Sequence, residues 1–310
     1  MSELILHHYP MSPFSHKVRT VFGFKRLDWK SVIIPAILPK PDVLALTGGY
    51  RKTPILQIGA DIYCDTALIC DVLEHEHPDP TLYPPEHKGL ARVVAQWADT
   101  TMFWAAMSYN FQSRGLQALF ASADRAAGEA FVNDRQAMGI PLMSTPEAAI
   151  AYRSDLRRIA GMLDEHPFLL GDQPCIADFA AYHPLRFTRV ATPELASIFD
   201  ATPQVLEWMD RIAQLGVGHM EKFTAQEALT VAADAEPVPL PDTEVFINDH
   251  GIDLGTKVSI AAERFGVEPT IGKLVAATRT RYTLSRIDAR VGHVHVHFPR
   301  VGYVMKAFDH

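Results

Sequence analysis

Two serines near the N-terminus have the type and position to do chemistry. Ser12 and Ser15 lie in the segment YPMSPFSHKVR, residues 9–19, between a predicted strand and the start of a predicted helix. Free N–H groups and the positive end of the helix dipole stabilise an anion at such a helix start. A hydroxyl there can donate a hydrogen bond to a thiolate and lower the pKa of a bound thiol. Ser12 is the preferred candidate and Ser15 the alternative, while a simple N-cap is the plainer role for Ser12.

The elements that must position these serines alternate between strand and helix. Apolar spacing and turn residues predict strands at 3–8, 30–34, 54–58 and 61–64, and helices at 14–22, 41–46 and 65–73. Gly48-Gly49 ends the second helix, Gly59-Ala60 predicts a hairpin, and Asp65 can cap the third helix. The predicted order is β-α-β-α-β-β-α.

In the rest of the chain the predicted type of secondary structure changes twice, each time at a proline-rich segment. Residues 79–87 (DPTLYPPEH) and 234–242 (DAEPVPLPD) predict linkers, and only helical spacing occurs between them. After the second linker, alternation with period two predicts a small antiparallel sheet or partial barrel. We therefore expect an α/β domain at 1–80, an all-α domain at 88–232 and a β-rich extension at 243–310, docked on the helical domain.

Composition excludes several classes of function. A net charge of −7 gives no general attraction to nucleic acid, and no apolar run reaches the roughly 20 residues of a membrane helix. The three cysteines, Cys64, Cys70 and Cys175, form no CxxC pair, which favours a reducing compartment. We expect a cytoplasmic protein without a membrane anchor or a signal peptide.

Two further segments carry a family resemblance. Residues 51–74 (RKTPILQIGADIYCDTALICDVLE) resemble part of the thioredoxin-like N-terminal domain of the cytosolic glutathione transferases. Residues 168–184 (FLLGDQPCIADFAAYHP) resemble the motif G-x-x-x-[ST]-[IL]-A-D of that family's all-helical domain. Asp178 of that motif is present, but Cys175 replaces the hydroxyl residue and is a weaker helix cap. The extension resembles no family.

The resemblance implies a glutathione site. It implies that Thr53–Pro54 is a cis peptide, that the Ile55 backbone pairs with the cysteinyl part of glutathione, and that Asp65 and Thr66 bind the γ-glutamyl group. Asp-Thr stands where the family usually has Glu-Ser. Lys40 and Lys52 are two candidates for the glycine carboxylate.

The resemblance also implies a reaction. Ser12-Pro13-Phe14 is similar to the serine version of the motif in tau-like classes, whereas thiol-transferring classes carry a cysteine there. Serine cannot form the mixed disulfide that reduction needs, so conjugation of glutathione to a small apolar electrophile, as in detoxification, is the leading hypothesis. The expected electrophile pocket contains Phe14, Phe103, Trp104 and Tyr109. The alternatives are a binding or scaffold protein with little turnover, and a glutathione-dependent thiol reductase or peroxidase. The family implies a homodimer.

Three histidines stand out in the extension. His293, His295 and His297 alternate with valines, so on a strand they share one face. Neighbours on one face lie almost 7 Å apart, at about 3.3 Å per residue, so a single metal ion would need other ligands or a bent strand. A polar stripe facing solvent or an interface is favoured, Val294 and Val296 face the small core, and no metal is expected.

Overall fold

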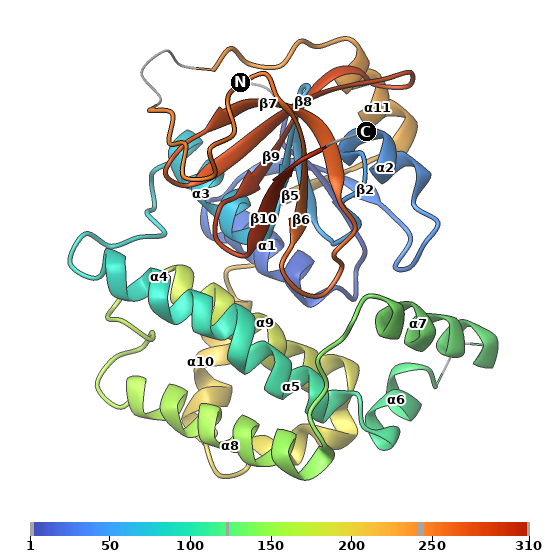
Figure 1. Ribbon diagram of the computed structural model, residues 1–310. Coiled ribbons are helices and arrows are strands. Elements are labelled where there is room, and N and C mark those ends of the chain that lie inside the picture. The colour runs from blue at the N-terminus through green and yellow to red at the C-terminus, as the bar shows by residue number, and fades with distance from the viewer. Residues whose placement is uncertain (1–2, 122–123, 241–244, 309–310) are drawn as a thin grey trace.

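The computed structural model describes residues 3–121, 124–240 and 245–308. The predicted order β-α-β-α-β-β-α of the first part is confirmed (Figure 1). Its elements are β1 (Ile5–His8), α1 (Pro13–Phe24), β2 (Asp28–Ile33), α2 (Pro41–Thr47), β3 (Ile55–Ile58), β4 (Asp61–Cys64) and α3 (Thr66–Glu76). Strand β1 lies between β2, to which it is parallel, and β3, to which it is antiparallel. This arrangement is the thioredoxin-like fold that the resemblance implies.

A helical block follows and lies below the sheet in Figure 1. It contains α4 (Lys88–Trp97), a π-helical turn (Ala98–Met102), α5 (Phe103–Asn110), α6 (Ser113–Leu119), α7 (Arg125–Ala137), α8 (Thr145–Met162), α9 (Ile176–Ala191), a 3₁₀ helix (Pro193–Phe199) and α10 (Pro203–Ala213). None of the described helices is long and apolar enough to cross a membrane.

The helical motif around Asp178 holds the start of α9. The fully buried Asp178 carboxylate accepts hydrogen bonds from the Leu169 and Cys175 amides, each at 2.9 Å, and from Trp208 Nε1 at 2.8 Å. Cys175 completes a capping box with Asp178. The aspartate therefore anchors α9 to the preceding loop and to α10, so this helix start is held although the hydroxyl residue is missing.

The end of the predicted helical stretch packs on the sheet and includes one strand that was not predicted. Strand β5 (His219–Phe223) pairs in parallel with β2, and α11 (Ala225–Ala233) packs near β2, β9 and α2. Strand β5 has the sequence HMEKF and is mostly exposed, so it carries none of the apolar alternation that predicts a strand.

The extension is β-rich, as predicted, but it is not a separate sheet. It contains β6 (Lys257–Ala262), β7 (Thr270–Ala277), β8 (Arg281–Asp288), β9 (Gly292–Pro299) and β10 (Tyr303–Ala307). Strand β9 pairs in parallel with β4, so the described strands form one ten-stranded sheet in the order β10-β6-β7-β8-β9-β4-β3-β1-β2-β5. The extension was expected to dock on the helical domain. This expectation is wrong, because the extension attaches mainly through β9 to the edge of β4.

The two faces of this sheet bury different cores. One face carries Leu6 and Leu56 and packs through α1 and α3 on the helical block. The other buries Ile62 of β4 together with Val294 and Val296 of β9 beneath α2 and α11, so the two valines face a core as predicted. The extension therefore shares its hydrophobic core with the N-terminal domain.

Candidate active site

The start of α1 presents Ser12 as predicted. Ser12 is the N-cap, and its Oγ accepts a hydrogen bond from the Ser15 amide at 3.2 Å. Neither the Ser12 hydroxyl proton nor the Phe14 amide has an acceptor among the described residues. Both donors are thus available to an anion at this helix start. The Ser15 hydroxyl is fully buried, three residues into the helix, and has no described partner.

The turn before β3 offers backbone groups beside this helix start. The Thr53–Pro54 peptide is cis, as the resemblance implies. Ile55 lies inside the sheet, paired with His7 on one side and Cys64 on the other. The backbone amide and carbonyl of Thr53, by contrast, have no partner among the described residues. On this turn the open backbone groups are therefore those of Thr53, whereas the Ile55 backbone is inside the sheet.

Asp65 and Thr66 stand at the start of α3. Asp65 is the N-cap and has φ 79°, a conformation that costs a non-glycine residue about 1–3 kcal/mol and that clusters at ligand sites. Its Oδ1 accepts from the Ala67 amide at 2.9 Å, and its Oδ2 accepts from the Tyr303 hydroxyl at 3.0 Å. Burial raises the pKa of Tyr303, which keeps it a donor. Sequence reasoning missed Tyr303, because it lies in β10, some 240 residues away along the chain.

The two candidate lysines lie in different surroundings. Lys40 Nζ donates to the Arg51 carbonyl and to Thr53 Oγ1, each at 3.1 Å. Burial, together with the charges of Arg135 and Arg51, lowers the pKa of Lys40 to about 7. A carboxylate bound here would restore the proton, so Lys40 suits an anionic ligand.

Lys52 points toward the extension. Its Nζ lies 4.9 Å from the ring centroid of Tyr303 and 5.6 Å from that of Tyr50. Burial lowers the pKa of Lys52, and the Asp65 carboxylate acts in the opposite direction. Lys52 is therefore on the Asp65 side of the site, and Lys40 is the better candidate for the glycine carboxylate.

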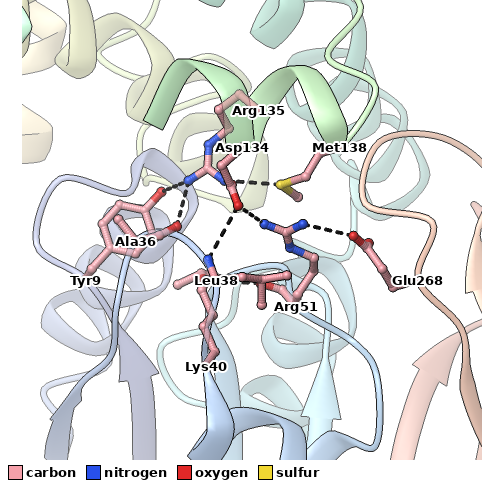
Figure 2. A network of polar contacts seen from close by, with 10 residues as sticks. Tyr9, Ala36, Leu38, Lys40, Arg51, Asp134, Arg135, Met138 and Glu268 are labelled. Atoms are coloured by element: carbon pink, nitrogen blue, oxygen red, sulfur yellow. Dashed lines mark hydrogen bonds and ion pairs between the residues drawn. The ribbon is translucent and has the colours of Figure 1, made fainter. Parts of the chain in front are cut away.

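An ion-pair network joins three parts of the chain around Lys40 (Figure 2). Buried Arg51 pairs with Asp134 of α7 and, at 2.9 Å, with Glu268 of the β6–β7 loop. Arg135 donates to Tyr9 Oη at 3.2 Å and to the Ala36 carbonyl at 2.9 Å. Because Arg51 is already paired twice, its charge is compensated within the chain and it holds the surrounding segments together.

Aromatic side chains lie under the start of α1. The ring of Phe14 is 4.5 Å from that of Phe103 and 4.6 Å from that of His183. Trp104 contacts Phe103 and also Phe265 of the β6–β7 loop, each with centroids 5.0 Å apart. The structure thus brings together Phe14, Phe103 and Trp104.

Tyr109 lies apart from this group. Its ring contacts Tyr152 of α8, with centroids 5.7 Å apart, and its hydroxyl donates to the Leu195 carbonyl at 3.4 Å. The residue is buried in the core of the helical block. The structure gives no support to the electrophile-binding role predicted for Tyr109.

A buried ion pair lies beside the starts of α1 and α3. Lys17 of α1 bonds to Asp99 in the π-helical turn and, at 3.4 Å, to Thr66 Oγ1. Although burial opposes the charge, the Asp99 carboxylate raises the pKa of Lys17. This pair ties α1 and α3 to the helical block. Sequence reasoning missed it because a buried lysine inside an amphipathic helix is unusual.

The three cysteines are unsuited to redox chemistry. Cys64, Cys70 and Cys175 are unpaired and buried. Burial raises the pKa of Cys70 to about 12 and that of Cys175 to about 12, and it raises the pKa of Cys64 as well. Reactive cysteines need a low thiol pKa and exposure, so the reductase hypothesis gains no candidate nucleophile.

Known proteins share this architecture. Residues 6–81 match the family model described as "Glutathione S-transferase, N-terminal domain", and residues 142–211 match "Glutathione S-transferase, C-terminal domain". A GST-like protein from Pseudomonas syringae is 41% identical in sequence, with a TM-score of 0.78, and the match covers 99% of this chain and 100% of that one. The 99% coverage includes the extension.

Two more distant proteins are also similar. A glutathione S-transferase from Methylobacterium radiotolerans, solved in complex with glutathione sulfonate, is 21% identical with a TM-score of 0.50, over 72% of this chain and 98% of that one. The FtsZ-localized protein A of Caulobacter vibrioides is 23% identical over 190 residues, which are 58% of this chain and 74% of that one. With both domain models matched in order and a 41% identical relative matched along its whole length, the chain belongs to the glutathione S-transferase family.

Proposed function

We propose that this protein binds glutathione between the starts of α1 and α3 and conjugates its sulfur to a small apolar electrophile. The observation that carries the proposal is the hydrogen bonding of the Ser12 hydroxyl. The Ser15 amide fixes the position of its Oγ, and its proton has no acceptor in the described chain. A thiolate placed above the helix start would take that proton as a hydrogen bond and would lie in the positive field of α1.

The neighbouring groups suit the remaining parts of the peptide. The open Thr53 amide and carbonyl can pair with the cysteinyl backbone, Asp65 can receive the γ-glutamyl ammonium, and Lys40 can bind the glycine carboxylate. Phe14, Phe103 and Trp104 offer an apolar surface to the electrophile. The distant relative that holds glutathione sulfonate supports the choice of ligand.

The proposed reaction requires only deprotonation and attack. The thiol proton leaves to water, and the thiolate stays hydrogen-bonded to the Ser12 hydroxyl until it attacks the electrophilic carbon. As the new C–S bond forms, either a leaving group departs with its electron pair, or the π bond of an activated alkene breaks and the resulting carbanion takes a proton from water. Ser12 is not itself modified. Since thiolate concentration sets the rate near neutral pH, a lower thiol pKa raises it directly.

Replacing Ser12→Ala is expected to raise the pKa of bound glutathione and slow conjugation by about 10- to 150-fold. One hydrogen bond to a charged group contributes about 1.5–3 kcal/mol, and 1.4 kcal/mol corresponds to tenfold. Thiolate ultraviolet absorbance against pH, at saturating glutathione, measures the pKa. The matched control is Ser15→Ala, which removes a hydroxyl buried deeper in α1.

The two serine variants separate the candidates. Loss of the N-cap in Ser12→Ala costs about 1 kcal/mol of stability, so the folded fraction is measured first by circular dichroism. A wild-type thiol pKa in Ser12→Ala, with a raised pKa in Ser15→Ala, would assign thiol activation to Ser15 instead.

Replacing Tyr303→Phe is expected to tighten glutathione binding by about tenfold. The Tyr303 hydroxyl takes one acceptor position of Asp65 Oδ2 and so competes with the ligand's ammonium. Removing a competing hydrogen bond to a carboxylate is worth about 1.5 kcal/mol, or about tenfold. Isothermal titration with glutathione measures the change, and Tyr282→Phe, at another buried tyrosine of the extension, is the control. Unchanged or weaker binding in Tyr303→Phe would show that Asp65 does not receive the ammonium.

A binding or scaffold role is the second candidate, and the β6–β7 loop favours it. Phe265 of this loop lies on Trp104, the Gly266 amide donates to the Met138 carbonyl at 2.8 Å, and Glu268 pairs with Arg51. The loop thereby bridges the N-terminal domain and the helical block beside the site. The name of the Caulobacter relative describes localisation with FtsZ. Glutathione binding without turnover on a broad panel of electrophiles would favour the scaffold role.

The proposal also includes an oligomeric state, a cellular location and a biological role that are usual in the family. We expect a homodimer, a cytoplasmic location and a role in detoxification. The extension bears on the dimer, because β9 covers the edge of β4 and any subunit contact must use other surfaces.

A further inference from the structure

A buried cluster of two histidines and one aspartate lies where the extension joins the N-terminal domain. Asp61 begins β4, and His295 and His297 lie on β9. Nδ1 of His295 and Nε2 of His297 lie 3.8 Å and 2.8 Å from the same oxygen, Asp61 Oδ1. The three donor atoms are all within 4.8 Å of one another.

The sheet register creates this convergence. Asp61 pairs directly with His295, and Tyr63 pairs with His297, so all four side chains point to one face. Val294 and Val296 point to the opposite face, into the shared core. A carboxylate from a neighbouring strand thus supplies the further ligand that two histidines on one straight strand cannot provide.

We infer that Asp61, His295 and His297 bind a divalent transition-metal ion such as Zn²⁺. Two imidazoles and a carboxylate are a common donor set for this ion. Bond lengths of about 2.0–2.2 Å place tetrahedral ligand atoms about 3.3–3.5 Å apart. The observed distances of 2.8 Å and 3.8 Å from Asp61 Oδ1 to the two ring nitrogens lie on either side of this range.

The hydrogen bonding of the cluster leaves one group without a partner. Nδ1 of His295 is buried and has no hydrogen-bond partner among the described residues, which is unusual for a buried polar atom. A metal ion between the three side chains would satisfy all of them.

The surrounding contacts suit metal ligands. His297 Nδ1 lies 3.0 Å from Thr283 Oγ1, and Asp61 Oδ2 accepts from the Val238 amide at 2.8 Å. The ring of His297 stacks on Tyr63, with centroids 4.5 Å apart and an interplanar angle of 13°. Such outer contacts fix the orientation and tautomer of a ligand.

One side of the cluster gives access for the ion. The side chain of His295 is 11% exposed, whereas those of Asp61 and His297 are each 3% exposed. A fourth coordination position would therefore face His295 and be taken by water. With Asp61 on β4 and both histidines on β9, the ion would also fasten the extension to the N-terminal domain.

The test uses the full-length, tag-free protein and Zn²⁺ in competition with a chromophoric chelator. The expected result is one ion per chain, and at least tenfold weaker binding in His295→Gln. This variant removes the ring nitrogen but keeps a polar side chain, and its metal-free melting temperature is measured first to establish that it folds. The control His219→Gln, at an exposed histidine of β5, should bind zinc as wild type does.

Two further readouts distinguish a defined site from loose binding. Co²⁺ should give the intense visible bands of tetrahedral coordination in wild type and lose them in His295→Gln and Asp61→Asn. Zinc should raise the melting temperature of wild type but not of His295→Gln. Equal zinc affinity in wild type and His295→Gln, or no zinc binding by wild type, would overturn the inference.

Discussion

A chain ending at residue 240 is expected to yield no stably folded protein. The truncation removes β6–β10, uncovers the edge of β4 and opens the core beneath α2 and α11. Six of the buried side chains that would be lost are Val258, Leu274, Leu284, Val294, Val296 and Phe298. Each fully buried apolar side chain contributes about 1.5–3 kcal/mol, and a domain has about 5–15 kcal/mol in total. Solubility after expression and the thermal transition of any soluble fraction measure the effect.

A cleaved chain is the control for this truncation. A protease site placed between residues 240 and 245 cuts the connection but keeps every strand, so the two pieces should remain together on gel filtration. If the truncated protein is instead soluble and melts at the wild-type temperature, the extension contributes nothing to the N-terminal core. In that case the pairing of β9 with β4 would not depend on a shared hydrophobic core.

Acid is expected to unfold the protein well above the pH at which carboxylates are protonated. His7, His8 and His16 are buried, and burial lowers their pKa values to about 4, about 3 and about 2. The Nε2 atoms of His7 and His8 meet Gln57 and Ser31, while their Nδ1 atoms have no described partner. A second ring proton would be buried there without an acceptor, which favours the neutral form.

The lowered pKa values determine how the free energy of unfolding changes with pH. Below the unfolded pKa of about 6.5 the unfolded chain binds more protons than the folded one, so the free energy of unfolding falls as pH falls. Each histidine costs about 1.4 kcal/mol per pH unit, so at pH 5 the three together cost about 6 kcal/mol. That is comparable to the whole stability of a domain, whereas above pH 6.5 the contribution is fully present.

Urea unfolding between pH 7 and pH 5 measures this slope. His8→Gln should reduce the slope by about one proton, or about 1.4 kcal/mol per pH unit. The exposed His75→Gln of α3 should leave it unchanged. A wild-type free energy of unfolding that is flat over this range would show that these histidines titrate normally in the folded protein.

Local sequence patterns predicted the elements of the N-terminal domain and two of its helix caps. Helical spacing and turn residues located α1 and α3, so the places of Ser12 and Asp65 as helix caps could be predicted and are confirmed. The cis bond before Pro54 followed from the family resemblance and is also confirmed.

Contacts between distant segments could not be predicted in the same way. The alternation of valine and histidine indicates which side chains share a face, but it does not say which strand lies beside β9. The pairing of β9 with β4, the bond from Tyr303 to Asp65 and the approach of Asp61 to His297 all depend on that choice. The histidine stripe was expected to face solvent or an interface, yet His295 and His297 are buried.

The strand order of the sheet sets the timing of folding. Strand β4 cannot pair with β9 until the helical block has been synthesised, because the two strands lie far apart in the sequence. At about 5–20 residues per second, the roughly 230 residues between Asp61 and His295 take about 10–50 s to synthesise. Throughout that interval the nascent chain exposes an unpaired strand edge and half of an apolar core, both of which promote aggregation. Non-local pairing of this kind also slows refolding, so the edge of β4 is expected to be a site of aggregation until β9 has been synthesised.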